Sequence, residues 1–509
     1  MDTESFDYVI VGAGSSGCAL AYRLATSTAA SVLLIEAGTD VIPPAVRDAS
    51  SWPLLLNSEY DWRYRTVPQR HAAGRAFAWP RGRIVGGCSA MNGMVFLRGA
   101  PADYDEWERL GCRGWGYQDV LAEFRGLEAY HDGGDRRYRG DSGPLHPRTI
   151  AARHPLSGAL IKATMERGHR FNPDFNAQAI EGAGWNDLLI ADGQRQDLGT
   201  TLVEPLKDRD HFHVLTGAVV TRLLVDRPAA RVRGVEYASG GNLGQVMAGR
   251  EVVVCAGAVD SPRLLLLSGI GPASDLATLD IPVVADLPGV GKNLHDHLLI
   301  GVVYEAKAPI PPINVNITEA CLFAKSDPSG AQCDIEISFV HEPMFTPGFS
   351  PPDNSYSIIP GIVKPQSRGT ITLASPDPAT PPLIDPHYLE DDADLRGLVR
   401  GIELSREIGL APALDAWRRR EVVPGPPAHD AASLEDFVRR SVCTWYHPVG
   451  TCKMGVDAEA VVDPALKVRG VEGLRVADAS VMPTVVSANT NAASIMIGWR
   501  AARLILDAR

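Results

Sequence analysis

Long apolar runs and basic clusters are scarce in this sequence of 509 residues. The opening stretch Met1–Asp7 is acidic and polar, and the apolar run Tyr8–Gly12 is too short for a signal-peptide core or a membrane span. The sequence therefore predicts a cytoplasmic protein with no membrane span. The formal charge is -12, and the basic run Arg418–Arg420 is interpreted as a solvated helix face, so a nucleic-acid or anionic-membrane partner is not expected.

Cysteine pairs and metal-ligand clusters are also missing. The eight cysteines are scattered with no Cys-x-x-Cys spacing, which favours free buried thiols over a zinc site or a dithiol centre. His295 and His297 stand close together without a third ligand at a suitable spacing, so we interpret them as part of a structured loop near a domain junction, with a metal site as the alternative. With 45% hydrophobic residues, the chain can bury two linked cores.

The N-terminal segment has the pattern of a strand, a glycine turn and a helix. Phe6–Val11 is a run of strand-forming residues, and the pattern of Cys18–Ala25 predicts a helix. Gly12 permits a tight turn, Gly14 lets the backbone approach a pyrophosphate, and Gly17 lets the helix pack close to the strand. The turn consists of six small residues: Gly12, Ala13, Gly14, Ser15, Ser16 and Gly17. The helix N-terminus would then face the phosphates of a dinucleotide.

A carboxylate follows the next predicted strand. Ser31–Ile35 leads into Glu36 and Ala37, about 20 residues beyond the glycine turn, where an acidic residue is expected to bind the ribose hydroxyls. Glu36 would repel a 2′-phosphate, so the segment favours FAD or NAD and leaves the choice between them open. An ordinary glycine turn with Glu36 as a surface acid is the alternative.

Two later stretches resemble the signatures of the glucose-methanol-choline (GMC) oxidoreductases. The first is the glycine-rich segment Gly82–Asn92, and the second runs from Gly257 to Gly271 after the predicted strand Glu251–Cys255. The similarity covers nearly the whole chain. It implies an α/β fold with a Rossmann-like FAD-binding domain interleaved with an α+β substrate domain built on an antiparallel sheet.

The resemblance implies FAD as the cofactor. In the family, the glycine-rich loop runs along the isoalloxazine ring, with Asn92 touching it. Members similar to choline oxidase share the Gly-Gly-Cys-Ser sequence around Cys88 but carry a flavin-linked histidine where this chain has Met91, so the FAD is expected to be non-covalent. Further cofactor contacts are assigned by the same resemblance: Arg83, Gly87, Gly93, Met94, Val95, Val220, Ala256 and Tyr446.

A histidine-proline motif near the C-terminus, Thr444–Gly455, is similar to the catalytic motif of the family. Histidine suits proton abstraction because its unperturbed pKa, about 6.5, lies close to operating pH. Pro448 restrains the backbone of His447 to an extended conformation. His447 is therefore the candidate catalytic base, with a buried structural histidine as the alternative.

The last segment supplies the other candidate catalytic group. Asp478 and Ala479 fall where the family binds the ribityl and phosphate atoms of the flavin. Counting back from the closing apolar helix, the second catalytic position, histidine or asparagine across the family, falls on Asn489. The same resemblance places the backbone of Asn491 and Ala492 near the flavin pyrimidine. Either asparagine could instead cap the helix, and the choice between the two as catalytic group stays open.

These candidates predict oxidation of a small-molecule alcohol. Hydride leaves an alcohol carbon readily only when the hydroxyl proton is removed, so His447 is expected to act as the base while Asn489 holds the oxygen. FAD would accept the hydride. Dioxygen and a quinone or carrier protein stay open as electron acceptors. A hydroxynitrile lyase, in which no hydride moves, is the alternative from a different class of activity.

The substrate is indicated by two resemblances that differ. Met91–Trp107 resembles choline and aliphatic alcohol dehydrogenases, whereas the chain length and Pro381–Pro427 resemble pyridoxine 4-oxidase. We favour a primary alcohol, with its hydroxymethyl group on an aromatic or heteroaromatic ring. The choline or aliphatic alcohol dehydrogenase activity is the alternative.

The spacing of the motifs predicts two interleaved domains. The FAD-binding domain takes residues 1–148, 200–299 and 441–509, with a lid at about 45–80, and the substrate-binding domain takes residues 151–199 and 300–440. Alternating runs at Cys333–Val340 and Gly369–Leu373 predict an antiparallel sheet in the second domain. Aromatic residues in Ser50–Arg65 are similar to the family's lid, and Ala308–Ile313 and Glu342–Pro352 are expected to form entrance walls.

Overall fold

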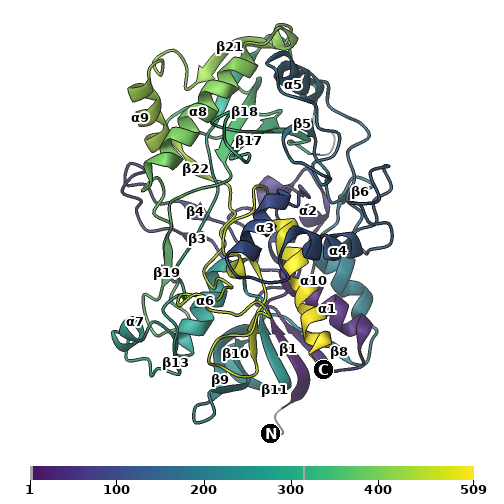
Figure 1. Cartoon of the computed structure of the whole chain (residues 1–509), viewed down its shortest axis with the longest axis vertical. Helices are drawn as coiled ribbons and strands as arrows, with labels where there is room; N and C mark the ends of the chain where they lie inside the picture. The colour runs from purple at the N-terminus through teal and green to yellow at the C-terminus, as the bar shows by residue number, and fades with distance from the viewer. Residues whose placement is uncertain (1–3, 313–315, 509) are drawn as a thin grey trace.

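The computed structural model describes residues 4–312 and 316–508. Met1–Thr3, Ile313 and Arg509, which belong to the predicted domains and entrance wall, lie outside the described residues. The fold is mixed α/β, as the sequence predicts. Figure 1 shows one sheet at the lower end of the molecule, near the N-terminus, and a second sheet with its own helices at the upper end.

The first sheet forms around the N-terminal strand. Strand β1 runs parallel to β2 on one side and to the C-terminal half of β11 on the other, and β23 pairs in parallel with β11. β8 extends the sheet beyond β2, whereas β9 and β10 extend it with antiparallel pairing. Over the described residues it has seven strands: β1 (Ser5–Val11), β2 (Val32–Ile35), β8 (Phe212–Leu215), β9 (Val219–Asp226), β10 (Arg231–Ser239), β11 (Asn242–Val254) and β23 (Leu474–Val476).

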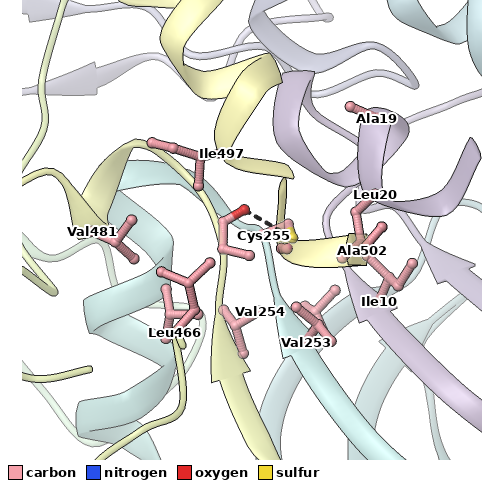
Figure 2. Packing of buried hydrophobic residues seen from close by; sticks show 14 of the residues in the cluster. Ile10, Ala19, Leu20, Val253, Val254, Cys255, Leu466, Val481, Ile497 and Ala502 are labelled. Carbon is pink, nitrogen blue, oxygen red and sulfur yellow. Dashed lines mark hydrogen bonds between the residues drawn. The ribbon is translucent and has the colours of Figure 1, made fainter. Parts of the chain in front are cut away.

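Helices α1 (Ser15–Ser27) and α10 (Asn491–Asp507) pack against each other beside this sheet (Figure 1). A Cβ on Gly498 of α10 would lie 2.0 Å from the backbone oxygen of Ser16, so glycine is required where the helices touch. Figure 2 shows the core that results, in which strand residues meet both helices: Ile10, Val253 and Val254 with Ala19, Leu20, Ile497 and Ala502.

The cysteines are free thiols, as the sequence predicts. Six are buried, whereas Cys88 and Cys443 are only partly buried. Cys255 lies in the core of Figure 2, where its thiol donates a hydrogen bond to the carbonyl oxygen of Ala477 at 3.3 Å. These side chains therefore act as small hydrophobic residues.

The second sheet is antiparallel and lies among the residues between the cofactor motifs. Its long strands β17 and β18 pair with each other, and β16 and β15 flank them. Over the described residues it has eight strands: β5 (Gly182–Trp185), β14 (Leu298–Leu299), β15 (Val302–Ala306), β16 (Ala320–Ala324), β17 (Ile335–Val340), β18 (Ser355–Ile362), β21 (Arg418–Val423) and β22 (Cys443–Thr444). The second alternating run contains β19 (Thr370–Thr372), which pairs with β20 (Leu383–Asp385) in a separate antiparallel sheet.

The interpretation of Arg418–Arg420 as a helix face is wrong. These residues begin β21, which pairs with β15 at the end of the second sheet. Arg419 and Arg420 form ion pairs with Glu305 of the neighbouring strand at 2.9 and 2.8 Å. Charged side chains on a terminal strand oppose pairing with another chain, which explains a basic run at this position.

The remaining elements surround the two sheets. Helices α5, α8 and α9 belong to the upper end, with α5 and α8 packed against the second sheet (Figure 1). The helices are α2 (Pro44–Arg47), α3 (Pro101–Arg109), α4 (Tyr117–Leu127), α5 (Pro155–Glu166), α6 (Gly257–Leu267), α7 (Ala273–Ala277), α8 (Asp392–Gly409) and α9 (Ala431–Ser441). The short strands are β3 (Tyr64–Arg65), β4 (Ala78–Trp79), β6 (Ile190–Ala191), β7 (Gln194–Arg195), β12 (Ile270–Gly271) and β13 (Ala285–Asp286).

The two-domain division stays a prediction, although the first sheet takes its strands from the three blocks predicted to bind FAD. Strands β14 and β22 also lie in those blocks, yet they pair with the second sheet or with each other. Among helices within the described ranges, none combines the length and the apolar character needed to cross a membrane.

Candidate active site

A cavity of about 630 Å³ extends from the first sheet to the second. One end lies at the carboxyl ends of the parallel strands, where Gly12, Glu36 and Ala256 follow β1, β2 and β11. The other end is formed by second-sheet residues such as Leu299 and Ile359. Ligands of open α/β sheets bind at the carboxyl ends of the strands, and this volume is within the range of small-molecule sites.

All residues predicted for the site line this cavity except Gly17, Arg83 and Ala492. Gly17 packs against the turn, where a Cβ would lie 1.9 Å from the backbone oxygen of Gly12. The Arg83 side chain is exposed, with its guanidinium 5.0 Å from the ring centre of Trp62. Ala492 is buried in the first turn of α10.

The glycine turn has the geometry that a dinucleotide requires. Gly12 has a φ of 100°, and a Cβ there would lie 2.6 Å from the backbone oxygen of Cys255. Nothing lies within 4 Å of the Cβ position of Gly14, which faces the cavity at the start of α1. The open backbone and the positive end of the helix together suit a pyrophosphate.

Glu36 is a buried carboxylate in the cavity wall, exposed by only 6%. Its two oxygens accept hydrogen bonds from the backbone N–H groups of Ala13, at 3.0 Å, and Gly38, at 2.8 Å. Burial raises the pKa of Glu36 to about 7, while the two hydrogen bonds act to lower it. The turn therefore fixes a carboxyl group beside the glycines, at the place where a ribose diol would bind.

The glycine-rich segment packs against the same turn. A Cβ on Gly87 would lie 2.6 Å from the Cα of Gly14, so two glycines bring the two loops into backbone contact. The side-chain oxygen of Asn92 accepts hydrogen bonds from the backbone N–H of Met94, at 3.0 Å, and from Arg195, at 2.9 Å. Arg195 was not identified from the sequence, although it holds Asn92 in place.

Asp478 connects its own segment to the first turns of α6 in the cavity wall. Its carboxylate accepts hydrogen bonds from the backbone N–H groups of Gly257, at 2.9 Å, and Ser480, at 2.8 Å, and from the hydroxyl of Ser261 at 2.5 Å. Asp478 is exposed by only 2%, and burial raises its pKa. Its side chain therefore organises the loop that contains Ala479.

His447 and Asn489 meet at the cavity wall. The Nε2 atom of His447 lies 3.4 Å from the Nδ2 atom of Asn489, and the Oδ1 atom of Asn489 has no hydrogen-bond partner within the described structure. The indole ring of Trp445 stacks beside the imidazole of His447, with ring centres 5.9 Å apart at 15°. Polar atoms of His447 and Asn489 therefore converge beside an aromatic surface.

A second histidine contacts His447 from behind. The Nδ1 atoms of His297 and His447 lie 3.0 Å apart. Burial lowers the pKa of His447 well below its usual value, and the positive forms of His297 and Arg81 lower it further. Burial also lowers the pKa of His297 to about 3. Both rings are therefore neutral at neutral pH.

The backbone around His447 is held by Asp296. Its carboxylate accepts hydrogen bonds from the backbone N–H of His447, at 2.8 Å, from the hydroxyl of Thr444, at 2.5 Å, and from the hydroxyl of Tyr388. Burial raises the pKa of Asp296 to about 6. The position that the sequence indicated as a structured loop thus contacts the candidate base directly.

The residue before His447 has an unusual backbone conformation. Tyr446 has a φ of 62°, in the left-handed region that non-glycine residues rarely occupy. The Arg81 guanidinium donates a hydrogen bond to the carbonyl oxygen of Tyr446 at 2.7 Å, and the hydroxyl of Thr444 accepts one from its N–H at 2.8 Å. This conformation helps to direct His447, and Arg81 was not identified from the sequence.

The predicted lid and entrance residues contribute unequally. Trp52 and Trp62 line the cavity, whereas the hydroxyl of Tyr64 donates a hydrogen bond to Asp260 at 2.8 Å. Phe345 lines the cavity and is 78% exposed. Phe349 instead packs against the ring of Phe437, with ring centres 5.5 Å apart.

The second-sheet end of the cavity is largely apolar and was not predicted residue by residue. It is lined by Leu299, Ile317, Val340, Met344, Ile359 and Trp445. Glu336 and Ser338 of β17 are polar residues in the same wall. Within residues 4–312 and 316–508, no cluster of three or more His, Cys, Asp or Glu side chains could hold a metal ion.

Comparisons with known proteins place these residues in a family. Models described as GMC oxidoreductase match residues 6–299 and 365–498. Mitochondrial choline dehydrogenase of Homo sapiens is 38% identical over 99% of this chain and 90% of the relative, and alcohol dehydrogenase [acceptor] of Pseudomonas putida is 36% identical over 98% and 96%. The structure of pyridoxine 4-oxidase from Mesorbium loti superposes with a TM-score of 0.95, at 36% identity over 99% of each chain.

Proposed function

Because the chain belongs to the GMC oxidoreductase family, we propose that it oxidises a primary alcohol to the aldehyde, with His447 as the base that removes the hydroxyl proton. It is an FAD-dependent oxidoreductase that acts on alcohol donors, related to choline dehydrogenase, alcohol dehydrogenase and pyridoxine 4-oxidase. The observation that carries the proposal is the convergence of His447 and Asn489 on the wall of the cavity.

Residues at the first-sheet end of the cavity fit FAD. The backbone at Gly14 and the start of α1 offer N–H groups to a pyrophosphate, and Glu36 offers a carboxyl group to a ribose. When bound, FAD supplies a two-electron acceptor for the hydride. We propose non-covalent binding because Met91 stands where a histidine carries the covalent bond in some family members.

The contact between the two histidines supports a particular proton arrangement. One Nδ1 atom must donate and the other must accept, since both rings are neutral. The Nδ2 amide of Asn489 lies 3.4 Å from Nε2 of His447 and can only donate, so we assign the proton of His447 to its Nδ1 and leave Nδ1 of His297 as the acceptor. His447 then donates from Nδ1, and the lone pair of its Nε2 is directed toward Asn489 and the cavity. This is the form that can accept a proton from an alcohol.

Asn489 is the second group that we assign to the substrate. Its amide lies beside the basic nitrogen of His447, so a hydroxyl group between the two side chains would donate its proton to His447 and accept a hydrogen bond from Asn489 at its oxygen. Asn491 is less suited, because its side-chain oxygen accepts a hydrogen bond from the Ser15 hydroxyl at 2.7 Å. The residue that caps α10 is Thr490, so neither asparagine occupies the helix cap.

The cavity wall favours an aromatic or heteroaromatic hydroxymethyl compound. The Trp445 ring stacks beside His447, and the other side chains around it are mostly apolar. A flat ring next to Trp445 would place its hydroxymethyl group near His447 and Asn489. Dioxygen and a quinone or carrier protein are both compatible acceptors. A cytoplasmic location stays a prediction.

The test is anaerobic reduction of the purified yellow protein by a panel of alcohols, followed at the flavin absorption band at about 450 nm. Benzyl-type alcohols, pyridoxine, 5-hydroxymethylfurfural and choline form the panel. Bleaching by one of them would support alcohol oxidation, and the rate of recolouring in air would separate an oxidase from a dehydrogenase. Failure of the whole panel would count against the proposal and favour a reaction without hydride transfer.

His447→Ala provides the decisive variant. We expect flavin reduction to slow by about 10² to 10⁴-fold, since that is the usual contribution of a positioned base, while the protein stays yellow. His295→Ala is the matched control, because His295 is also buried but lies outside the cavity wall. An unchanged reduction rate in His447→Ala would refute the assignment.

A further inference from the structure

A buried acidic side chain lies in the apolar end of the cavity. Glu336 is the second residue of β17 and is exposed by only 2%, yet it is part of the cavity wall. Figure 1 shows β17 and its neighbour β18 at the upper end of the molecule, away from the cofactor turn. The mechanism proposed above does not use this carboxyl group.

The register of the sheet fixes the direction of Glu336. Side chains alternate along a strand, and Glu336, Ser338 and Val340 all line the cavity while Ile335, Ile337 and Phe339 belong to the core behind the sheet. Across the ladder Glu336 pairs with Gly361 of β18. Directly opposed residues lie on the same face of a sheet.

Trp445 connects this position to the candidate base. A Cβ on Gly361 would lie 2.3 Å from the Cζ3 atom of Trp445, so the indole ring occupies the space that a side chain would take. Glu336 is the cross-strand neighbour of that glycine, which places its side chain beside the indole. The imidazole ring of His447 stacks beside the same indole ring.

The Glu336 carboxyl group lacks the partners that a structural carboxyl group has. One oxygen accepts a hydrogen bond from the Ser338 hydroxyl at 3.3 Å, and the other has no hydrogen-bond partner in the described part of the chain. No lysine, arginine or histidine of the described residues forms an ion pair with it. Burial raises the pKa of Glu336 to about 8. By contrast, buried Asp296 and Asp478 each accept three hydrogen bonds.

We propose that Glu336 is a substrate-binding residue that selects alcohols carrying a positively charged nitrogen. This rests on the proposed function, because the hydroxyl group is taken to bind at His447 and Asn489. The cation would supply the missing partner of the carboxylate, and the indole face of Trp445 would add a cation–π contact. An apolar residue at this position would otherwise be favoured, since an unpaired buried carboxyl group costs free energy.

The test uses pairs of alcohols that differ only in charge. 4-(Aminomethyl)benzyl alcohol is compared with 4-ethylbenzyl alcohol, and choline with 3,3-dimethylbutan-1-ol. Anaerobic flavin reduction at a range of concentrations gives the apparent dissociation constant and the limiting rate. We expect one cationic alcohol to bind about ten to a hundred times more tightly than its neutral partner, as a charged hydrogen bond or ion pair in a buried site would give.

Glu336→Gln removes the charge and keeps the shape of the side chain. We expect this variant to lose most of the preference for the cationic alcohol, with little change in the apparent dissociation constant of the neutral alcohol. Glu342→Gln is the matched control, because Glu342 also lines the cavity but is exposed to solvent, and we expect the preference to remain. An equal effect of the two variants would indicate general electrostatic attraction and would overturn the proposal.

A measurement without turnover separates this inference from the proposed function. Benzylammonium and tetramethylammonium have no alcohol group to oxidise, and calorimetric titration measures their binding directly. We expect at least one of them to bind the parent protein and the Glu342→Gln variant, and to bind Glu336→Gln at least about ten times more weakly. If neutral alcohols reduce the flavin at the same rates as the cationic alcohols, and calorimetry detects no binding of the cations, the role of Glu336 is refuted. Alcohol oxidation would still stand in that case. Cation binding without flavin reduction by any alcohol would instead refute the proposed function.

Discussion

Replacing Glu336 by glutamine is expected to stabilise the protein, and to do so more strongly as pH rises. The carboxyl group has a pKa of about 8 in the folded protein and 4.5 as the ordinary value. Below 4.5 it is protonated in both the folded and the unfolded chain, so its burial has no pH-dependent cost. Between the two values the unfolded chain ionises more readily, and the free energy of unfolding falls as pH rises.

The size of the effect follows from the two pKa values. Each tenfold change in proton activity between them corresponds to about 1.4 kcal/mol, so the cost reaches about 1 kcal/mol at pH 5, about 3 kcal/mol at pH 7 and no more than about 5 kcal/mol above pH 8. For a chain of this length unfolding cooperatively, about 1 kcal/mol corresponds to a shift of about 1 °C in the unfolding temperature.

The assay is thermal unfolding of the flavin-loaded protein and its variants from about pH 5 to about pH 8.5, without a cationic ligand. The unfolding temperature of Glu336→Gln should exceed that of the parent by a margin that grows across this range, to about 3 °C at pH 7. The glutamine amide does not titrate, so its own effect on the unfolding temperature is the same at every pH. The diagnostic quantity is therefore how the difference in unfolding temperature changes with pH. Glu342→Gln is the matched control, because Glu342 lines the same cavity but is exposed to solvent. A flat difference for Glu336→Gln would refute the reasoning that its carboxyl group is buried without a partner.

Five further outcomes are expected for the flavin-loaded protein and its variants. His447→Ala should lose about 10² to 10⁴-fold in rate, and the parent rate with a neutral alcohol should show no fall near pH 6.5, because burial keeps His447 neutral well below that pH. Asn489→Ala should lose about 10 to 10³-fold, whereas Asn491→Ala should chiefly weaken flavin retention, measured by the flavin content after dialysis. Gly361→Val should displace the Trp445 ring, slow reduction at least about tenfold and shift the tryptophan fluorescence. Equal rate losses for the two asparagine variants would contradict the assignment of Asn489, and an unaffected Gly361→Val would contradict the role of Trp445.

The parts of the fold that the sequence predicts are those with strong local signals. The strand, glycine turn and helix around Gly12 are all present, because a Cβ on Gly12 or on Gly17 would collide with the backbone that it packs against. Strand β21 was misinterpreted because three consecutive arginines have no alternating pattern. The two-residue strands β14 and β22 have too few residues for any periodic signal, and they form only because the chain brings Leu298 beside Thr444.

The residues of the candidate site differ in the same way, because some lie in local sequence motifs and others do not. His447 and Asn489 lie in sequence motifs and both line the cavity, whereas the positions of Asp296, Trp445 and Glu336 depend on which elements face each other. Glu336 is the clearest case, because polar residues at alternate positions of a strand are typical of a face in contact with water. Here that face borders the cavity, and only the pairing of β17 with β18 and the placement of Trp445 reveal it.

The two candidate catalytic side chains are held by different sheets. His447 follows β22, which pairs with β14 beside the second sheet, and its backbone is bound to Asp296 just before β14. Asn489 lies just before α10, which packs against α1 beside the first sheet. The contact between Nε2 of His447 and Nδ2 of Asn489 therefore depends on the relative position of the two sheets. A substitution that loosens this junction would slow proton abstraction without touching either side chain, because catalysis is sensitive to displacements of about 1 Å.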